Sequence, residues 1–88
     1  MTPYRVRYAL GAEADLVGLL DFLAERDIDA ALRATDAIET SIALLELSPF
    51  SCRKVDPENP LMRELVIPFG RAGYVALFQI EPPDAVTI

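Results

Sequence analysis

Histidine is absent from this sequence, and cysteine occurs only once. Zinc sites, histidine-based catalytic triads and Cys–His pairs draw on these two residue types, so all three are excluded. The sequence also lacks a phosphate-binding loop and a dinucleotide-binding fingerprint. Its carboxylates, such as Glu13, Asp15, Asp36 and Glu39, are interpreted as solvated helix faces. We therefore expect no metal, no cofactor and no catalytic residue.

The single cysteine, Cys52, lies beside Arg53 and Lys54. Neighbouring cations lower the pKa of a thiol. With no histidine to serve as a base, we nevertheless interpret Cys52 as an incidental, half-buried thiol. One cysteine cannot form a disulfide within its own chain, which favours a reducing, cytoplasmic location.

Positive charge is also scarce, since eight Lys and Arg residues face fourteen Asp and Glu residues and the net charge is −6. Nucleic-acid-binding proteins rely on basic surfaces that displace counterions from phosphates. The composition thus favours a protein partner over direct contact with RNA or DNA. No apolar run reaches the roughly eighteen residues of a membrane span, and the first residues contain no signal-peptide core. The length suits one small domain, residues 1–88.

The first half of the sequence predicts a strand followed by a helical hairpin. Residues 4–8 alternate between apolar side chains and arginines, as a half-buried strand does. One helix begins near residues 11–12; a second follows a turn near residues 27–28, with Asp29 as its N-cap, and ends at Ser48-Pro49. Each helix has an apolar stripe at spacings of three and four residues: Leu16, Leu19, Leu20 and Leu23, then Ala31, Thr35, Ile38, Ile42 and Leu45.

Three leucines of the second helix, Leu32, Leu44 and Leu47, lie off this stripe. They must face either the sheet or a partner protein. We favour the sheet, and keep Leu32 and Leu44 as candidate partner contacts.

The second half predicts a loop at residues 50–60 and three strands, at 61–69, at 74–81 and from 86 to the end. Gly70 and Gly73 bracket the turn between the first two strands, where glycine enters positive φ without a Cβ clash. Residues 82–84 form the last turn. The strand at 74–81 is apolar on both faces. Because two helices cover only one face of a sheet, the other face is a candidate partner surface.

The order of elements, the opening Tyr-x-Val-x-Tyr and the segment Arg63–Phe78 (RELVIPFGRAGYVALF) resemble the RelE/ParE superfamily of type II toxin–antitoxin toxins. The Arg-Glu-Leu and Gly-Tyr-Val elements resemble its ParE-like branch. The resemblance spans nearly the whole chain. It implies an α+β fold of order β-α-α-β-β-β, in which a curved antiparallel sheet packs on an N-terminal-half helical hairpin. It also implies a ParD-like antitoxin whose C-terminal segment wraps the toxin in a hetero-oligomer.

Two activities occur in the superfamily. RelE-like members cut messenger RNA on the ribosome, with lysines in the strand before the turn and an arginine directly after the Gly-Tyr pair. Here Val66 and Pro68 stand at the lysine positions and Val75 at the arginine position. The resemblance therefore implies a ParE-like toxin that inhibits DNA gyrase by binding it, as in plasmid stabilization. A ribosome-dependent endoribonuclease is the alternative, and a non-toxic antitoxin-binding module a further alternative.

The candidate partner contacts that the resemblance suggests are Arg63, Arg71 and Tyr74. Each also has an ordinary interpretation, as an ion pair at a strand edge, a solvated turn residue and a strand packing residue. Superfamily members usually continue past the final Val-x-Ile into the rest of a strand and a basic tail. We therefore expect a C-terminally short domain, with Val86-Thr87-Ile88 early in its last strand.

Overall fold

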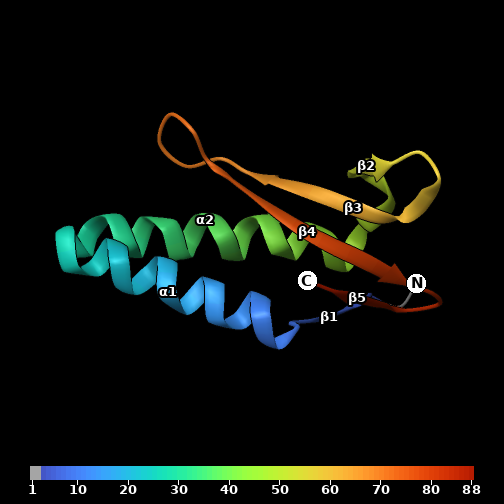
Figure 1. Cartoon of the computed structure of the whole chain (residues 1–88), viewed down its shortest axis with the longest axis horizontal. Helices are drawn as coiled ribbons and strands as arrows, with labels where there is room; N and C mark the ends of the chain where they lie inside the picture. Colours follow the sequence, from blue (N-terminus) through green and yellow to red (C-terminus); the bar gives the residue numbers. More distant parts are fainter. Residues whose placement is uncertain (1–2) are drawn as a thin grey trace.

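A helical hairpin packs on one face of a five-stranded sheet in the computed structural model, which describes residues 3–88 (Figure 1). This is the expected α+β fold. The elements in chain order are β1 (Arg5–Arg7), α1 (Leu10–Arg26), α2 (Ile28–Leu47), the 3-10 turn η1 (Pro49–Ser51), β2 (Arg53–Asp56), β3 (Asn59–Ile67), β4 (Tyr74–Glu81) and β5 (Ala85–Thr87).

The two helices are joined by a single non-helical residue, Asp27, whose φ of −162° and ψ of 104° are extended. Its carboxylate accepts a hydrogen bond from the Ala30 amide at 3.3 Å, and this contact caps α2. The prediction of Asp29 as the N-cap is wrong, because Asp29 already lies in the first helical turn. An acidic side chain there still interacts favourably with the helix dipole.

The core lies between α2 and the inner face of the sheet. The predicted stripe of α1 is present and half-buried, so α1 covers the side of the core without entering it. Burying each large apolar side chain contributes about 1.5–3 kcal/mol, so this cluster dominates the stability of so small a domain. Its buried members are Ile38, Leu45, Leu65, Ile67, Phe78, Ile80 and Val86.

The strand order in the sheet is β1-β5-β4-β3-β2. All neighbouring pairs are antiparallel except β1 and β5, which run parallel with Val6 opposite Val86. The N-terminal strand β1 therefore forms one edge of the sheet and lies beside the C-terminal strand β5 (Figure 1).

Strand β2 lies within the segment predicted as a loop, and this is a correction. All four of its residues are exposed, so no apolar alternation marks it in the sequence. Its pairing with β3, Arg53 opposite Glu64 and Lys54 opposite Arg63, is what makes it a strand. β3 also begins and ends two residues before the predicted range 61–69.

The turn between β3 and β4 has the predicted glycine chemistry. Gly70 and Gly73 both have positive φ, at 58° and 69°. The Gly73 amide donates to the Phe69 carbonyl at 2.7 Å. A Cβ at Gly73 would lie 2.6 Å from the carbonyl oxygen of Ile67, so this position requires glycine for space as well as for φ.

Candidate partner-binding surface

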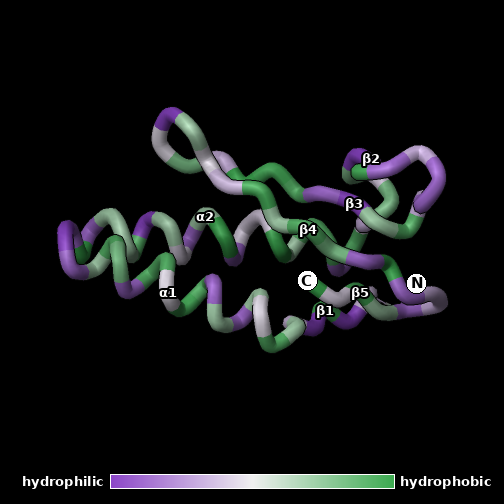
Figure 2. The backbone as a smooth tube through the Cα atoms, in the orientation of Figure 1, coloured by the Kyte–Doolittle hydropathy of each residue, from purple (hydrophilic) through white to green (hydrophobic). Residues whose placement is uncertain are grey.

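The outer face of the β3–β4 hairpin carries three apolar side chains, Val66, Val75 and Leu77, each about half exposed. Val66 stands directly opposite Val75, and Leu77 is opposite Glu64. The inner face of the same strands is buried against the helices. Figure 2 shows hydrophobic residues in both strands toward the turn, and a hydrophilic stretch of β3 beside its label. The hairpin therefore has the uncovered apolar face that the sequence predicted; we call these three residues the outer patch.

Ion pairs lie on both sides of the β3–β4 hairpin. Glu64 pairs with Arg53 of β2. At the other side of the sheet Arg7 pairs with Glu81 at 3.1 Å and Arg5 with Asp84 at 3.4 Å. An apolar centre with a polar, charged rim is the usual anatomy of a protein–protein interface.

A shallow groove continues the outer patch toward α2. It lies between α2 and β3 and is lined by Leu44, Val66, Pro68 and the polar or small residues Asp36, Ala37, Thr40 and Ser41. Leu44 is 57% exposed, so its side chain extends the apolar surface from the sheet onto the helix.

The preference for Leu32, Leu44 and Leu47 as sheet-facing residues is wrong. Their exposure ranges from 57% to 70%. The sheet-facing stripe of α2 consists instead of Ala34, Ile38, Ser41 and Leu45. Because Ile38 and Leu45 serve both the helix seam and the sheet, no further stripe is needed, and the three leucines face solvent. Leu32 and Leu44 are accordingly accessible to a partner.

Arg63 is buried, with 8% of the residue exposed. Its Nε donates to the Pro60 carbonyl at 2.6 Å, and its Nη1 donates to the carbonyls of Phe50 and Cys52 at 3.0 and 2.8 Å. The guanidinium carbon also lies 5.4 Å from the centre of the Phe50 ring. Arg63 therefore ties η1 and the start of β2 to β3, and presents little surface to a partner.

Arg71 and Tyr74 lie at the tip and base of the glycine turn. Arg71 is exposed, whereas Tyr74 is half-buried on the inner side of β4. The Tyr74 ring stacks on Phe69 with the ring centres 5.5 Å apart. Arg63, Arg71 and Tyr74 thus do not form one cluster: the first is internal, the second is exposed in the glycine turn, and the third faces the helices.

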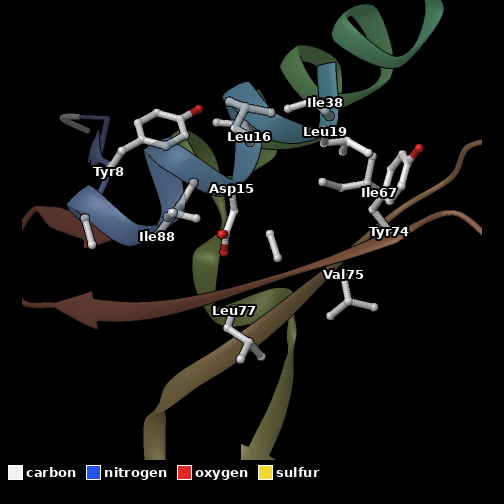
Figure 3. Close-up of a pocket in the computed structure, with 14 residues that line it drawn as sticks. Tyr8, Asp15, Leu16, Leu19, Ile38, Ile67, Tyr74, Val75, Leu77 and Ile88 are labelled. Carbon is white, nitrogen blue, oxygen red and sulfur yellow. The ribbon is translucent and has the colours of Figure 1, made fainter. Parts of the chain in front are cut away.

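An open cleft that was not predicted from the sequence lies between the first half of α1 and β4 (Figure 3). It has a volume of about 540 Å³, and we call it the α1–β4 cleft. Val75 and Leu77 point out of the sheet below it, while Leu16, Leu19 and Tyr74 lie on its helix side. The lining residues are Tyr8, Ala9, Ala12, Asp15, Leu16, Leu19, Ile38, Ile42, Ile67, Tyr74, Val75, Ala76, Leu77 and Ile88.

Two titratable groups have shifted pKa values. Burial raises the pKa of the Cys52 thiol, and the nearby Arg63 guanidinium only partly opposes this shift. The thiol is therefore not activated, even though Arg53 and Lys54 follow it in the sequence. Burial and the Glu39 carboxylate raise the pKa of Tyr8. Within residues 3–88, no group of three or more metal-ligating side chains is gathered, and no helix is long and apolar enough to cross a membrane.

Comparison with known proteins assigns the chain to a family. A family model described as the ParE toxin of the type II toxin–antitoxin system parDE matches residues 6–88. Toxin RelE1 of Caulobacter vibrioides is 32% identical over 77 residues, which cover 88% of this chain and 80% of that toxin. The match includes both helices, the outer patch and the α1–β4 cleft. The chain therefore belongs to the ParE toxin family, within the RelE/ParE superfamily, and is a toxin of a type II toxin–antitoxin system whose partner is an antitoxin.

Proposed function

We propose that this toxin acts in the cytoplasm by binding DNA gyrase, and that the antitoxin neutralises it by covering the outer patch and the adjacent α2 groove. The observation that carries the proposal is the chemistry of the outer sheet face. Val66 and Val75 stand opposite each other there, and Pro68, which is exposed, follows directly after the end of β3. RNA-cutting members of the superfamily have cationic side chains at these three positions.

Three apolar side chains cannot stabilise a phosphate or transfer a proton. A ribonuclease site needs donors placed where charge develops in the transition state, and such donors account for much of its rate enhancement. An exposed apolar patch is instead suited to desolvation against another protein. A net charge of −6 also opposes association with RNA.

The test is inhibition of purified gyrase by the purified toxin, measured as loss of supercoiling and accumulation of cleaved DNA. We expect inhibition that rises with the ratio of toxin to gyrase. Leu77→Arg should abolish it by placing a charge in the outer patch. Gln79→Arg is the matched control, because Gln79 is exposed two residues further along the same strand.

Each alternative predicts a different result. If the toxin cleaves messenger RNA during translation and does not inhibit gyrase, it is a ribosome-dependent ribonuclease. Normal growth of cells that express the toxin alone would leave a non-toxic, antitoxin-binding module. The antitoxin itself is sought in the small reading frame next to the toxin gene: co-expression of its product should restore growth.

A further inference from the structure

The α2 groove, between α2 and the turn end of β3, combines apolar and polar side chains. It has a volume of about 490 Å³. Its larger apolar side chains come from both sides of the groove, namely Leu44, Val66 and Pro68. Its polar side chains all come from α2, namely Asp36, Thr40 and Ser41. Residues three to five apart on a helix lie within one turn of each other, so a carboxylate and two hydroxyls are gathered on one side of the groove.

Ser41 is buried, with 7% of the residue exposed, yet its hydroxyl has no partner in the protein. It takes part in none of the side-chain hydrogen bonds within residues 3–88. The Thr35 hydroxyl, by contrast, donates to the Ala31 carbonyl at 2.9 Å, which is a common way for a helix to satisfy a hydroxyl. No fully buried side-chain oxygen or nitrogen in this part of the chain lacks a hydrogen bond. The Ser41 hydroxyl is therefore open to the groove that it lines.

The charge around the groove favours a cation. The two helices carry eight carboxylates and two arginines. The ion pairs within residues 3–88 all lie on the sheet or its turns, so Asp36 at the groove is unpaired. Arg33, one turn earlier on α2, forms no ion pair with it. Uncompensated charge of one sign raises the local concentration of ligands of the opposite sign.

An arginine side chain matches both the shape and the charge of the groove. Long basic side chains lay their aliphatic stems along apolar surface and keep the charged head among polar groups. Leu44 and Val66 suit the stem. The planar guanidinium has enough donors for the Asp36 carboxylate and the Ser41 hydroxyl together. An acidic side chain would be repelled by Asp36, and an apolar one would leave the Ser41 hydroxyl without a partner.

We propose that an arginine of DNA gyrase enters the α2 groove, with its stem on Leu44 and Val66 and its guanidinium at Asp36 and Ser41. The inference rests on the proposed function. An enzyme that binds DNA presents basic surface to the phosphates, so gyrase has the charge that complements the acidic helices. A second copy of the toxin is disfavoured as the occupant, because each copy has a net charge of −6. The groove thus adds a charged contact to the apolar outer patch.

The first test measures the affinity of purified gyrase for the whole immobilised toxin by surface plasmon resonance. Asp36→Asn should weaken binding about two- to fivefold, as for a partly exposed ion pair. Glu39→Gln is the matched control, because it removes the same charge from an exposed residue of α2 that does not line the groove. It should change the affinity little. Equal losses in the two variants would assign the effect to net charge and overturn the proposal.

Two further substitutions test the groove itself. Ser41→Ala removes the hydroxyl without adding volume, and should weaken gyrase binding about tenfold because a hydrogen bond to a charged group is lost. Leu44→Arg supplies a guanidinium from the toxin's own chain, which should compete for Asp36 and weaken binding by at least about tenfold. Since Leu44 is exposed, this variant should fold as the wild type does. Leu32→Arg is its control, an exposed leucine of α2 outside the groove; equal losses for the two leucines would refute the assignment.

A peptide probe tests the groove without gyrase. The probe is acetyl-Leu-Arg-Leu-amide, and its control has citrulline, which has nearly the shape of arginine but no charge, in place of the arginine. Amide chemical shifts of the whole toxin, measured by NMR during titration, locate the binding. We expect saturable shifts confined to residues 36–44 and to Val66, with the citrulline peptide at least about twofold weaker. Equal binding of the two peptides, shifts elsewhere, or no saturable shift up to the solubility limit would overturn the proposal.

These arms separate failure of the groove from failure of the target. If wild-type toxin inhibits gyrase but the groove variants behave as their controls do, the groove assignment is wrong and the target stands. If the toxin binds the arginine peptide but not gyrase, both the target and the source of the arginine are wrong. Capture of the purified antitoxin by Leu44→Arg is measured in parallel. Loss of this capture with unchanged gyrase binding would assign the arginine to the antitoxin and overturn the proposal.

Discussion

Replacing Arg63 by alanine should destabilise the toxin more than any other substitution of a charged residue in residues 3–88. The side chain donates three hydrogen bonds to the backbone carbonyls of Phe50 in η1, Cys52 just before β2 and Pro60 in β3. A hydrogen bond that involves a charged group contributes about 1.5–3 kcal/mol, and water can reach some of the freed carbonyls because Phe50 is half exposed. We therefore expect a loss of about 3–5 kcal/mol in the free energy of unfolding, out of a total of about 5–15 kcal/mol for a domain of this kind.

Urea denaturation followed by circular dichroism measures this loss, and the melting temperature should fall by at least about 12 °C. Arg63→Lys keeps the charge but has one donor group in place of the planar fork. Its stability should therefore lie between that of the wild type and that of Arg63→Ala. Arg71→Ala is the control, since Arg71 is exposed in the turn and its loss should change stability by less than about 0.5 kcal/mol. An Arg63→Ala protein that is as stable as wild type but fails to bind its partner would refute the structural role and establish a direct contact.

Three further predictions concern backbone, cap and thiol. Gly73→Ala should lower the free energy of unfolding, measured by thermal denaturation, by about 2–4 kcal/mol. The substitution places a Cβ at a position with positive φ and against the carbonyl oxygen of Ile67 in β3. Gly70→Ala, which has open space at the Cβ, should cost only about 1–2 kcal/mol; equal losses would contradict the clash. Asp27→Ala should cost about 1 kcal/mol by removing the α2 cap, and a larger loss for Asp29→Ala would return the cap to Asp29. Because the folded pKa of Cys52 is raised above the ordinary 9.0, its contribution is fully present below pH 9 and is lost as pH rises through the folded pKa. The free energy of unfolding, measured from pH 8 to 11, should therefore fall with rising pH, and Cys52→Ala should make this slope shallower. An unchanged slope would show that other groups cause the pH dependence.

The sequence predicted the elements that have a local signature. The leucine spacing of α1, the alternation of Tyr4 to Tyr8 and the two glycines each reflect a rule that acts over a few residues. The same rules failed at β2, whose residues are all exposed and whose strand character comes only from pairing with β3. They also misplaced the α2 cap by two residues, because a one-residue linker leaves no periodicity to mark the boundary.

Some features of the candidate partner-binding surface could likewise be predicted from the sequence, and others could not. The apolar outer phase of β4 was evident from Val75 and Leu77, and a count of helices was enough to predict that it would be uncovered. The exposure of Leu32 and Leu44 was not evident from the sequence. The sequence could not show that Ile38 and Leu45 would contact both the other helix and the sheet. Nor did any feature of Arg63 distinguish an internal clamp from a surface charge, because its three acceptors are backbone carbonyls, which every residue possesses.

By itself, the sequence determined the order of the helices and of the strands other than β2, the chemistry of the glycine turn and the presence of apolar side chains on both faces of β4. These follow from sterics and from side-chain periodicity, which act between near neighbours in the chain. The tertiary structure alone decided the parallel pairing of β1 with β5 and the burial of Arg63. Each of these depends on which distant segments lie side by side, and the pairing of distant segments is set by the packing of the whole chain.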